Sequence, residues 1–247
     1  MATPDLEVLD RISPPARPVS PPHPIPSSPS RRRSTTRAAS LEYFSPFCYS
    51  ARGESLTAER SRGLRLLIKS RNPRILDLCI ERLVAMLHTG LTPSFLSIQS
   101  LALVPIPRRV PTVRALSTNS APAAIAHRLL GAGIGVHFWP ALIRRTAIAK
   151  SAWARPGSRP AFAEHHDSLE ILDHSPPTRQ ILLVDDIITR GRTLLSAAVL
   201  LRDEIPRIDV FGFALIRTDG LATDIAQITS PVTGVIRLLG GDAFRSP

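Results

Sequence analysis

Residues 181–197 read ILLVDDIITRGRTLLSA, and this stretch decides the fold. Its first four residues are apolar, which indicates a buried strand of a parallel sheet. Two acids, Asp185 and Asp186, come next, followed by a short loop at 189–193. Apolar residues at helical spacing then predict an amphipathic helix over 193–204. The sequence therefore predicts a strand, an acidic pair, a loop and a helix in immediate succession.

The loop at 189–193, TRGRT, has the features of an anion site. Where a loop opens a helix, free backbone N–H groups and the positive end of the helix dipole favour a bound anion, most naturally a phosphate. Gly191 permits a close approach of the ligand to the backbone, and Thr189 and Thr193 can donate hydroxyl hydrogen bonds. We expect this loop to lie on the surface.

Asp185 and Asp186 serve a different part of the ligand, because two carboxylates would repel a phosphate. They suit the hydroxyls of a sugar attached to that phosphate, or a Mg²⁺ ion carried with it. The stretch thus combines groups for a phosphate, a sugar and a metal ion.

Three other interpretations of the stretch are less consistent with the sequence. A receiver domain places such acids near its start and needs a later lysine, but no lysine follows Lys150. A Walker-type loop needs G-x-x-x-x-G-K-[ST], which is absent. A purely structural strand, turn and helix remains open, although two acids at the end of a buried strand are costly without partners.

The stretch resembles the phosphoribosyl-pyrophosphate (PRPP) motif of type I phosphoribosyltransferases, in which a hydrophobic strand, two acids and a T-x-G-x-T loop follow one another. Within that superfamily it is most similar to ComF-like proteins. The resemblance implies that the acids hold the ribose hydroxyls and, together with the substrate, Mg²⁺, and that the loop cradles the 5′-phosphate. The residues implied are the acids Asp185 and Asp186, also as catalytic residues, and the loop residues Thr189, Arg190, Gly191, Arg192 and Thr193.

Arg190 and Arg192 depart from the family pattern, which usually has small or uncharged residues at these positions. They either add positive charge to the phosphate site or face solvent. The solvent interpretation is slightly favoured.

A second stretch of resemblance is LVPIPRR at 103–109, which leaves a predicted strand and ends in two arginines. It is similar to a ComF-like V-P-[LI]-x-x-x-R stretch, whose loop contacts pyrophosphate in type I enzymes. The resemblance implies that Arg108 or Arg109 holds the leaving group, a role that suits the guanidinium fork. A solvent-facing arginine pair is the alternative. Of the family's acceptor motif, only Asn119 and Arg114 have counterparts here.

Residues 142–147, LIRRTA, resemble the segment that leads into a flexible catalytic lid in the family. A lid excludes water, which would otherwise capture the reactive ribose. The resemblance implies Lys150 as a catalytic residue and Arg155 and Arg159 as further cations over the pyrophosphate. Lys69 lies in LLIKSRN, which is similar to another short element of the family.

Strands and helices alternate along the chain, which predicts an α/β fold with an open, mainly parallel sheet flanked by helices. Ligands of such sheets bind beyond the carboxyl ends of the strands. The resemblance adds a small hood element, the part that recognises the acceptor in type I enzymes. Further elements expected are helices at 74–88 and 121–130, strands at 101–104, 136–143 (interrupted by Pro140), 168–172 and 209–216, and a loop at 144–162.

The chain is expected to form one domain with a tail. Residues 1–40 hold nine of the 24 prolines and the run RRR, which predicts a disordered tail. Residues 41–247 form the phosphoribosyltransferase-like domain, with an N-terminal helical and hood part at about 41–97 and a core at about 98–220.

The formal net charge of +11 comes almost entirely from arginine, since 29 of the 31 basic residues are arginines. A basic surface favours polyanionic ligands, from PRPP and nucleotides to nucleic acid. The cysteines are Cys48 and Cys79, and no C-x-x-C pair occurs. This excludes a tetrathiolate zinc site, including the N-terminal zinc module of many ComF-like proteins, and a disulfide framework.

No apolar run approaches the ~18 residues that span a bilayer. The first ten residues, MATPDLEVLD, lack the apolar region of a signal peptide. The expected location is therefore the cytoplasm, with no membrane partner.

The resemblance implies a Mg²⁺-dependent enzyme that binds PRPP, transfers its ribosyl 5-phosphate group to a nitrogen nucleophile and releases pyrophosphate. The acceptor is not identified by the sequence, and a homodimer is one expected assembly. Two other classes of function stay open. One is a non-catalytic regulator that binds PRPP or a nucleotide, and the other is a ComF-like factor associated with DNA uptake, for which nucleic acid binding has weak support.

Overall fold

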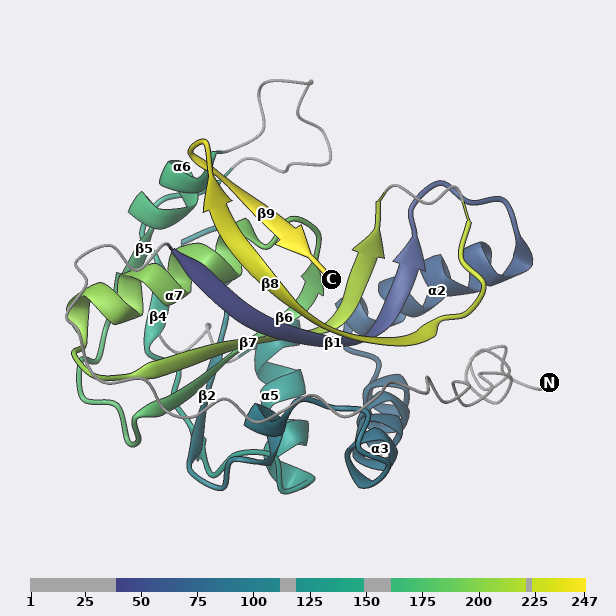
Figure 1. The fold of residues 1–247 in the computed structure, drawn as a ribbon, viewed down its shortest axis with the longest axis horizontal. Coiled ribbons are helices and arrows are strands. Elements are labelled where there is room, and N and C mark those ends of the chain that lie inside the picture. The colour runs from purple at the N-terminus through teal and green to yellow at the C-terminus, as the bar shows by residue number, and fades with distance from the viewer. Residues whose placement is uncertain (1–38, 112–118, 149–160, 221–223) are drawn as a thin grey trace, which may run out of the picture.

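The computed structural model describes residues 39–111, 119–148, 161–220 and 224–247, so nearly all of the tail expected at 1–40 lies outside the described residues. A seven-stranded sheet forms the centre of the molecule, with strand order β3-β2-β6-β7-β1-β8-β9 (Figure 1). The strands are β1 (Ser40–Ser50), β2 (Leu101–Pro105), β3 (His137–Phe138), β6 (Gln180–Ile188), β7 (Asp209–Asp219), β8 (Thr229–Leu239) and β9 (Asp242–Ser246).

Most of this sheet is parallel. Strands β3, β2, β6, β7 and β1 all pair in parallel, whereas β8 pairs antiparallel with β1 and with β9. A separate two-stranded sheet joins β4 (Leu142–Arg144) to β5 (Leu169–Ile171). The architecture confirms the predicted α/β fold with an open, mainly parallel sheet flanked by helices.

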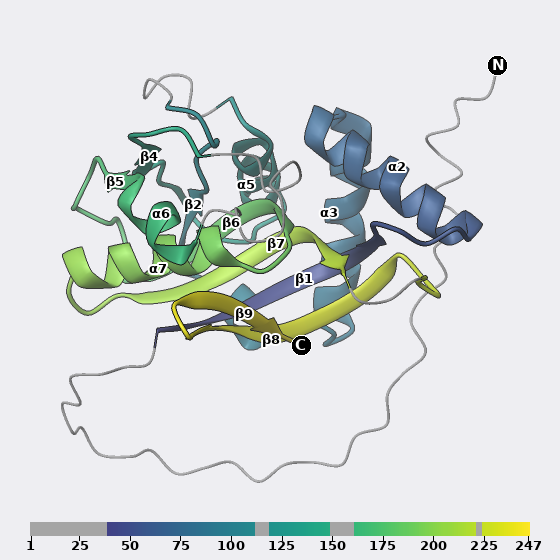
Figure 2. The same cartoon turned by 90° about the horizontal axis from the view of Figure 1, so that it is seen from above.

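Helices pack on both faces of the large sheet. The helices are α2 (Leu56–Ser70), α3 (Pro73–His88), α5 (Ala121–Gly131), α6 (Phe162–Asp167), α7 (Arg192–Glu204) and a 3₁₀ turn, η1 (Ser94–Ser97). Figure 2 shows α2 and α3 near the outer end of β1, and α6 and α7 beside the small sheet of β4 and β5. Helices α2, α3 and α5 share one apolar core, and α7 belongs to a second core.

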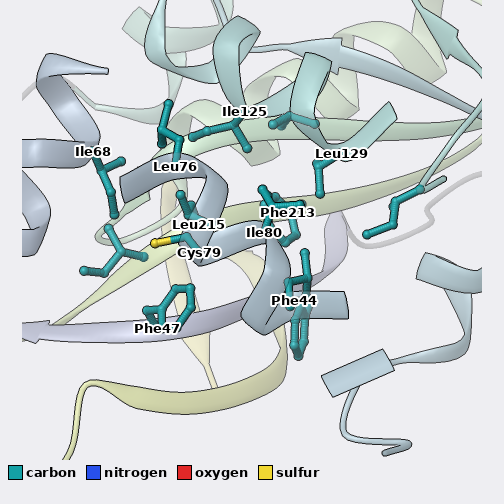
Figure 3. Packing of buried hydrophobic residues seen from close by; sticks show 14 of the residues in the cluster. Phe44, Phe47, Ile68, Leu76, Cys79, Ile80, Ile125, Leu129, Phe213 and Leu215 are labelled. Atoms are coloured by element: carbon teal, nitrogen blue, oxygen red, sulfur yellow. The ribbon is translucent and has the colours of Figure 1, made fainter. Parts of the chain in front are cut away.

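The alternation of side chains along β6 explains the two cores. Leu182 and Val184 belong to the core under α2, α3 and α5, whereas Ile181 and Leu183 belong to the core under α7. Successive side chains of a strand point to opposite faces, so an unbroken apolar run is buried on both sides. Figure 3 shows the first of these cores from close by, with aromatic and aliphatic side chains gathered around the sheet.

Cys79 is fully buried within that first core (Figure 3). Its removal from water raises the pKa of the thiol to about 12. Cys48 is also buried, and both cysteines are free. Cys79 therefore acts as a small apolar core residue, whereas the Cys48 thiol donates a hydrogen bond to Gln227 O at 3.3 Å.

Several elements agree closely with the sequence predictions. Helix α3 begins at Pro73, with the Asn72 side chain accepting a hydrogen bond from Ile75 N at 3.1 Å. Helix α5 begins after Ser120, whose hydroxyl accepts from Ala123 N at 3.2 Å. The strands expected at 101–104 and 209–216 and the helix expected at 193–204 are also present.

The strand expected at 136–143 is instead two short strands in different sheets. Strand β3 lies at the edge of the large sheet, and β4 starts beyond Pro140 in the small sheet. Proline fixes its own φ and has no N–H to donate, which ends the first strand. The strand expected at 168–172 is β5, also in the small sheet. Of the loop expected at 144–162, residues 149–160 lie outside the described residues.

The division into a helical hood part at 41–97 and a core at 98–220 differs from the structure. Strand β1 lies inside the large sheet, between β7 and β8, so the first described residues form part of the core sheet. The sheet also continues past residue 220 through β8 and β9. Strand β1 contains Leu41, Tyr43, Phe44 and Phe47, and the apolar residues on its two faces are buried against both cores.

No helix within the described ranges is long and apolar enough to cross a membrane.

Candidate functional site

Strand β6 positions the acidic pair. The strand runs on through both acids to Ile188, and Asp185 still pairs with Ala214 of β7. Asp185 lines a pocket at this end of the sheet. Asp186 is its neighbour on the strand, and its carboxyl group lies close enough to raise the pKa of Asp185. The two are linked through the backbone, since Asp186 N donates to Asp185 Oδ1 at 2.9 Å.

Gly191 forms the turn between β6 and α7. It has a φ of +81°, in the left-handed region that glycine adopts without steric cost, and it directly precedes the first residue of the helix. A Cβ atom at this position would lie 2.6 Å from Cδ1 of Ile236 on β8. Gly191 is itself buried, although Thr189 and Arg190 beside it are exposed. The loop is therefore packed against β8, and the expectation of a surface loop holds only for its first half.

The loop and the start of α7 form one wall of the pocket. The first turn of an α-helix has backbone N–H groups without intrahelical partners, and here they belong to residues 192–194. The pocket is lined by Arg109, His165, Asp185, Ile187, Ile188, Thr189, Arg190, Gly191, Arg192, Thr193 and Leu194. Three segments far apart in the sequence thus meet here: the residues after β2, helix α6 and the β6–α7 connection.

Arg109 is the member of the arginine pair that reaches the pocket. The loop after β2 is held against β6 by a hydrogen bond from Ile106 N to Val184 O at 2.9 Å. Arg108 is exposed, and its carbonyl oxygen accepts a hydrogen bond from Nε of Arg144 at 3.1 Å. The sequence left the choice between the two arginines open, and the geometry favours Arg109.

Arg144 is a buried cation behind the pocket. Its side chain is 2% exposed and also donates to Ser168 Oγ. Burial lowers the pKa of Arg144 to about 10, while the nearby Asp185 carboxylate acts in the opposite direction. No carboxylate of the described residues forms an ion pair with Arg144. It therefore adds positive potential beside Asp185 and Arg109.

Asp185 has a strongly perturbed carboxyl group. Removal from water and then the charge of Asp186 raise its pKa well above the usual range. Lys69, exposed at the end of α2, acts weakly in the opposite direction. Within the described part of the chain, no lysine, arginine or histidine forms an ion pair with either acid. The pair is therefore open to a cation or to hydroxyl donors of a ligand.

His165 is a pocket residue that the sequence analysis missed. It is 7% exposed, and its Nδ1 lies 3.2 Å from Thr193 Oγ1. Burial, followed by the charges of Arg144, Arg192 and Arg109, lowers its pKa to about 4, so the imidazole is neutral at pH 7. Its only signal in the sequence is its position just after the short element at 161–162.

Arg190 and Arg192 line the pocket, and both also form ion pairs with Asp242. Arg192 donates through Nε and Nη2 to both carboxylate oxygens of Asp242 on β9, and its side chain is 11% exposed. Arg190 is half-exposed, with Nη1 3.3 Å from Asp242 Oδ2. The favoured solvent interpretation is therefore wrong for Arg192. Asp242 lies beyond the stretch of resemblance, and nothing in the sequence indicated it.

Other residues singled out in the sequence are less informative. Asn119 is exposed and accepts a hydrogen bond from Arg71 Nη1, away from the residues that line the pocket. Lys150, Arg155, Arg159 and Arg114 lie outside the described residues. The catalytic role of Lys150 therefore stays a prediction.

The described residues contain no group of three or more histidine, cysteine, aspartate or glutamate side chains that could hold a metal ion. Two carboxylates, Asp185 and Asp186, are nonetheless adjacent. Mg²⁺ is commonly held by one or two carboxylates together with substrate oxygens and water, rather than by a full set of protein ligands. The donor set fits such a shared ion and does not fit a structural metal centre.

Comparison with known proteins gives little beyond this geometry. No family model and no curated protein matches the chain. Among solved structures, it is similar to a hypoxanthine phosphoribosyltransferase from Staphylococcus aureus. The identity is 14%, the match covers 68% of this chain and 70% of that one, and the TM-score is 0.30. A score this low carries no conclusion about function, which has to come from the site.

Proposed function

We propose that this chain is a type I phosphoribosyltransferase-like enzyme that binds PRPP with Mg²⁺ and transfers ribosyl 5-phosphate to a nitrogen nucleophile. One observation supports the proposal above the others. One pocket combines Asp185, an acid without an ion-pair partner among the described residues, with the N-terminus of α7 and the arginine Arg109. These are the groups that a phosphorylated sugar with a second anionic group requires.

The 5′-phosphate would bind at the start of α7. Gly191 turns the chain so that the first backbone N–H groups of the helix line the pocket, and the helix dipole adds positive potential there. Thr193 can add a hydroxyl donor, since its Oγ1 is held in place by His165 at 3.2 Å. Backbone amides, rather than the loop arginines, would then carry most of the binding.

The ribose would lie against the acids. Ionised carboxylates accept hydrogen bonds, and the sugar hydroxyls supply donors. Asp185 accepts a hydrogen bond from Asp186 N at 2.9 Å and has no ion-pair partner among the described residues, so sugar hydroxyls would add donors to its carboxylate. Asp186, whose carboxyl group lies close to that of Asp185, would reach the same ligand directly or through Mg²⁺ shared with the substrate. When bound, the ion would neutralise negative charge on the acids and on the pyrophosphate.

The leaving pyrophosphate would face Arg109, with Arg144 behind it. In the reaction, the bond from C1′ to the pyrophosphate oxygen breaks, a bond from C1′ to the acceptor nitrogen forms, and that nitrogen gives up a proton. Positive charge at Arg109 and Arg144 stabilises the departing anion as the bond breaks. The protein thus acts by position and charge, without a nucleophile of its own.

The finer assignments rest on sequence resemblance. The ComF-like subfamily is supported by the stretches at 103–109, 142–147 and 181–193, and the lid residue Lys150 by its position after the second of these. The acceptor stays open, as do cytoplasmic location and a homodimer.

The test combines binding and turnover. The purified chain is titrated with PRPP and Mg²⁺ by calorimetry, and pyrophosphate release is then measured with a panel of nitrogen acceptors, from ammonia to purine and pyrimidine bases. Asp185→Asn serves as the inactive control. We expect micromolar binding by the wild type, pyrophosphate release with at least one acceptor, and about a ten- to hundredfold weaker binding by the variant.

The outcomes separate the candidate functions. Binding without turnover for every acceptor would favour the regulator over the enzyme. Absence of binding up to millimolar PRPP would contradict the proposal as a whole. Salt-dependent binding of DNA in place of PRPP would favour the DNA-uptake factor.

A further inference from the structure

Both carboxylate oxygens of Asp242 accept two hydrogen bonds each. The residue begins β9, and its Oδ1 accepts from its neighbour Ala243 N at 2.8 Å and from Arg192 Nε. Its Oδ2 accepts from Arg192 Nη2 and from Arg190 Nη1. The hydrogen bonds from Arg192 lower the pKa of this carboxyl, so it is ionised across the physiological range. A planar guanidinium held by both oxygens fixes direction as well as distance.

The same hairpin contacts the loop at a second point. Ile236 on β8 fills the space where Gly191 would carry a side chain, at 2.6 Å from an ideal Cβ position. Strands β8 and β9 pair antiparallel, and Leu239 is opposite Asp242 in that pairing. Strands β8 and β9 form one edge of the large sheet (Figure 1), and helix α7 contacts both of them. The turn at Gly191 and the first helical residue, Arg192, are thus both fixed by one element.

We propose that Asp242 is a positioning residue for the phosphate loop at 189–193, acting through Arg192. The inference rests on the proposed function, because it assigns a role within the same site. By holding the Arg192 guanidinium at β9, Asp242 fixes the backbone of the loop before a ligand arrives, so that the amides of 191–193 already have the geometry of the bound state. Preorganised donors bind more tightly because no ordering cost remains at binding.

The charges around the pocket fit this division of roles. Arg192 is satisfied by Asp242, and its side chain is 11% exposed. Arg109 and Arg144 have no carboxylate within ion-pair distance among the described residues. The ligand's negative charge is therefore left to Arg109 and Arg144, and Arg192 stabilises the loop.

A competing role for Asp242 makes the opposite prediction. If the carboxylate merely competed with the ligand for Arg192, its neutralisation would free a guanidinium for the phosphate and tighten binding. If it positions the loop, its neutralisation loosens the amides and weakens binding. The sign of the change in affinity thus decides between them.

The experiment compares Asp242→Asn with Asp209→Asn, a matched control at the exposed start of β7. Backbone amide NMR shifts are recorded first without ligand, and ribose 5-phosphate and ribose are then titrated into each protein. We expect Asp242→Asn to move the amide signals of Gly191 and Thr193 and to weaken ribose 5-phosphate binding about tenfold, with little effect on ribose. Asp209→Asn should change neither, and Asp242→Glu should restore part of the affinity.

Arg192→Ala completes a double-mutant cycle. If Asp242 acts through Arg192, the double variant binds ribose 5-phosphate no more weakly than either single variant. Fully additive losses would overturn the inference, as would unchanged or tighter binding by Asp242→Asn. If Asp242→Asn does not fold, Arg192→Lys keeps the charge but loses the two-point contact, and it is expected to give the same amide shifts and the same loss.

Failure of the inference and failure of the proposed function remain distinguishable. If the wild type binds no ribose 5-phosphate, the proposed function is wrong, and the ligand-free amide shifts still decide whether Asp242 fixes the loop. If the wild type binds and Asp242→Asn leaves both shifts and affinity unchanged, only the positioning role is wrong.

Discussion

Two carboxyl groups flank the loop at 189–193, and their pKa values are shifted in opposite directions. Asp185 lies on the pocket side, where burial and Asp186 raise its pKa well above the usual range. Asp242 lies on the hairpin side, where Arg192 lowers its pKa. The first carboxylate lacks an ion-pair partner within the described residues, and the second has two guanidinium groups.

This difference indicates that the ligand binds on the side of the loop where Asp185 lies. A buried charge without a partner destabilises the folded protein, and such charges are common at functional sites, where a ligand or metal ion supplies the partner. A carboxylate that is already paired with arginines of the protein needs no ligand for this purpose. The arginines divide in the same way, since Arg192 is bound by Asp242 and Arg109 lines the pocket without a carboxylate partner in the described residues. The pocket side is expected to govern affinity, and the hairpin side to govern the shape of the loop.

The largest effect is expected at Gly191, where the two sides meet. Gly191→Ala places a side chain at a φ of +81° and 2.6 Å from Ile236. Left-handed backbone costs about 1–2 kcal/mol for a residue with a Cβ, and overpacking adds roughly 1–3 kcal/mol. The variant should therefore unfold at a lower temperature, by about 2–4 °C per kcal/mol, and should lose phosphate binding. Thermal denaturation followed by circular dichroism measures the first effect.

Gly241→Ala is the matched control for that substitution. Gly241 has a φ of +80°, but no atom lies within 4 Å of its Cβ position. It should show the backbone cost alone, about 1–2 kcal/mol. Equal stability of the two variants would mean that the loop does not pack against β8.

His165 is expected to make stability depend on pH. The pKa of His165 is about 4 when folded and near the ordinary histidine value of 6.5 when unfolded, so the unfolded chain binds the extra proton between these values. The stability that the neutral imidazole contributes is present in full above pH 6.5 and is lost as the pH falls towards 4. The loss amounts to roughly 3 kcal/mol.

Urea denaturation between pH 7 and 4 checks this expectation. The slope should be reduced in His165→Gln, and the same substitution at the half-exposed His174 is the control for the change of residue type. An identical pH dependence in wild type and His165→Gln would place the imidazole in water, away from Arg144 and Thr193.

Arg109→Ala tests the pocket side directly. A hydrogen bond to a charged group contributes about 1.5–3 kcal/mol, so loss of this guanidinium should weaken PRPP binding about ten- to hundredfold. Arg108→Ala is the control, because Arg108 is exposed and contacts Arg144 through its carbonyl oxygen only. Calorimetry should find a change of less than about threefold for the control. The reverse order would assign the leaving group to Arg108.

The smallest effect is expected in the stability of Asp185→Asn. A raised pKa means that the folded protein binds the proton more tightly than the unfolded one, so wild-type stability falls as the pH rises above the ordinary aspartate range. The amide should therefore make the ligand-free protein slightly more stable at pH 8, and the difference should vanish near pH 4. Melting curves at both pH values measure this, and a less stable variant at pH 8 would show that Asp185 is structural.

The sequence predicted what depends on neighbours along the chain. The apolar run at 181–184, the acids and Gly191 lie within eleven residues, and the strand, turn and helix that they predict are present. The caps Asn72 and Ser120 also act locally, which is why helices α3 and α5 could be placed closely.

What the sequence could not show depends on contacts between distant elements. Asp242 lies 50 residues after Arg192 in the sequence. The two residues meet because β8 pairs with β1 in the large sheet and β9 pairs with β8. His165 enters the pocket through packing of α6 on α7, where Ser196 Oγ donates to Phe162 O at 3.3 Å. The sequence placed the residues of β1 in the helical and hood part of the domain, but β1 pairs with β7 and β8 inside the large sheet. Pairing between strands that lie far apart in the chain leaves no pattern in the local sequence.

The central claim, that the loop at 189–193 binds the phosphate of a phosphorylated ribose, is tested most directly by NMR. PRPP with Mg²⁺ is titrated into ¹⁵N-labelled protein, and the backbone amide signals are followed. We predict saturable shifts that are largest at Gly191, Arg192 and Thr193, with a Kd in the micromolar range, corresponding to about −8 kcal/mol. Shifts confined to other parts of the chain, or none up to millimolar PRPP, would contradict the claim.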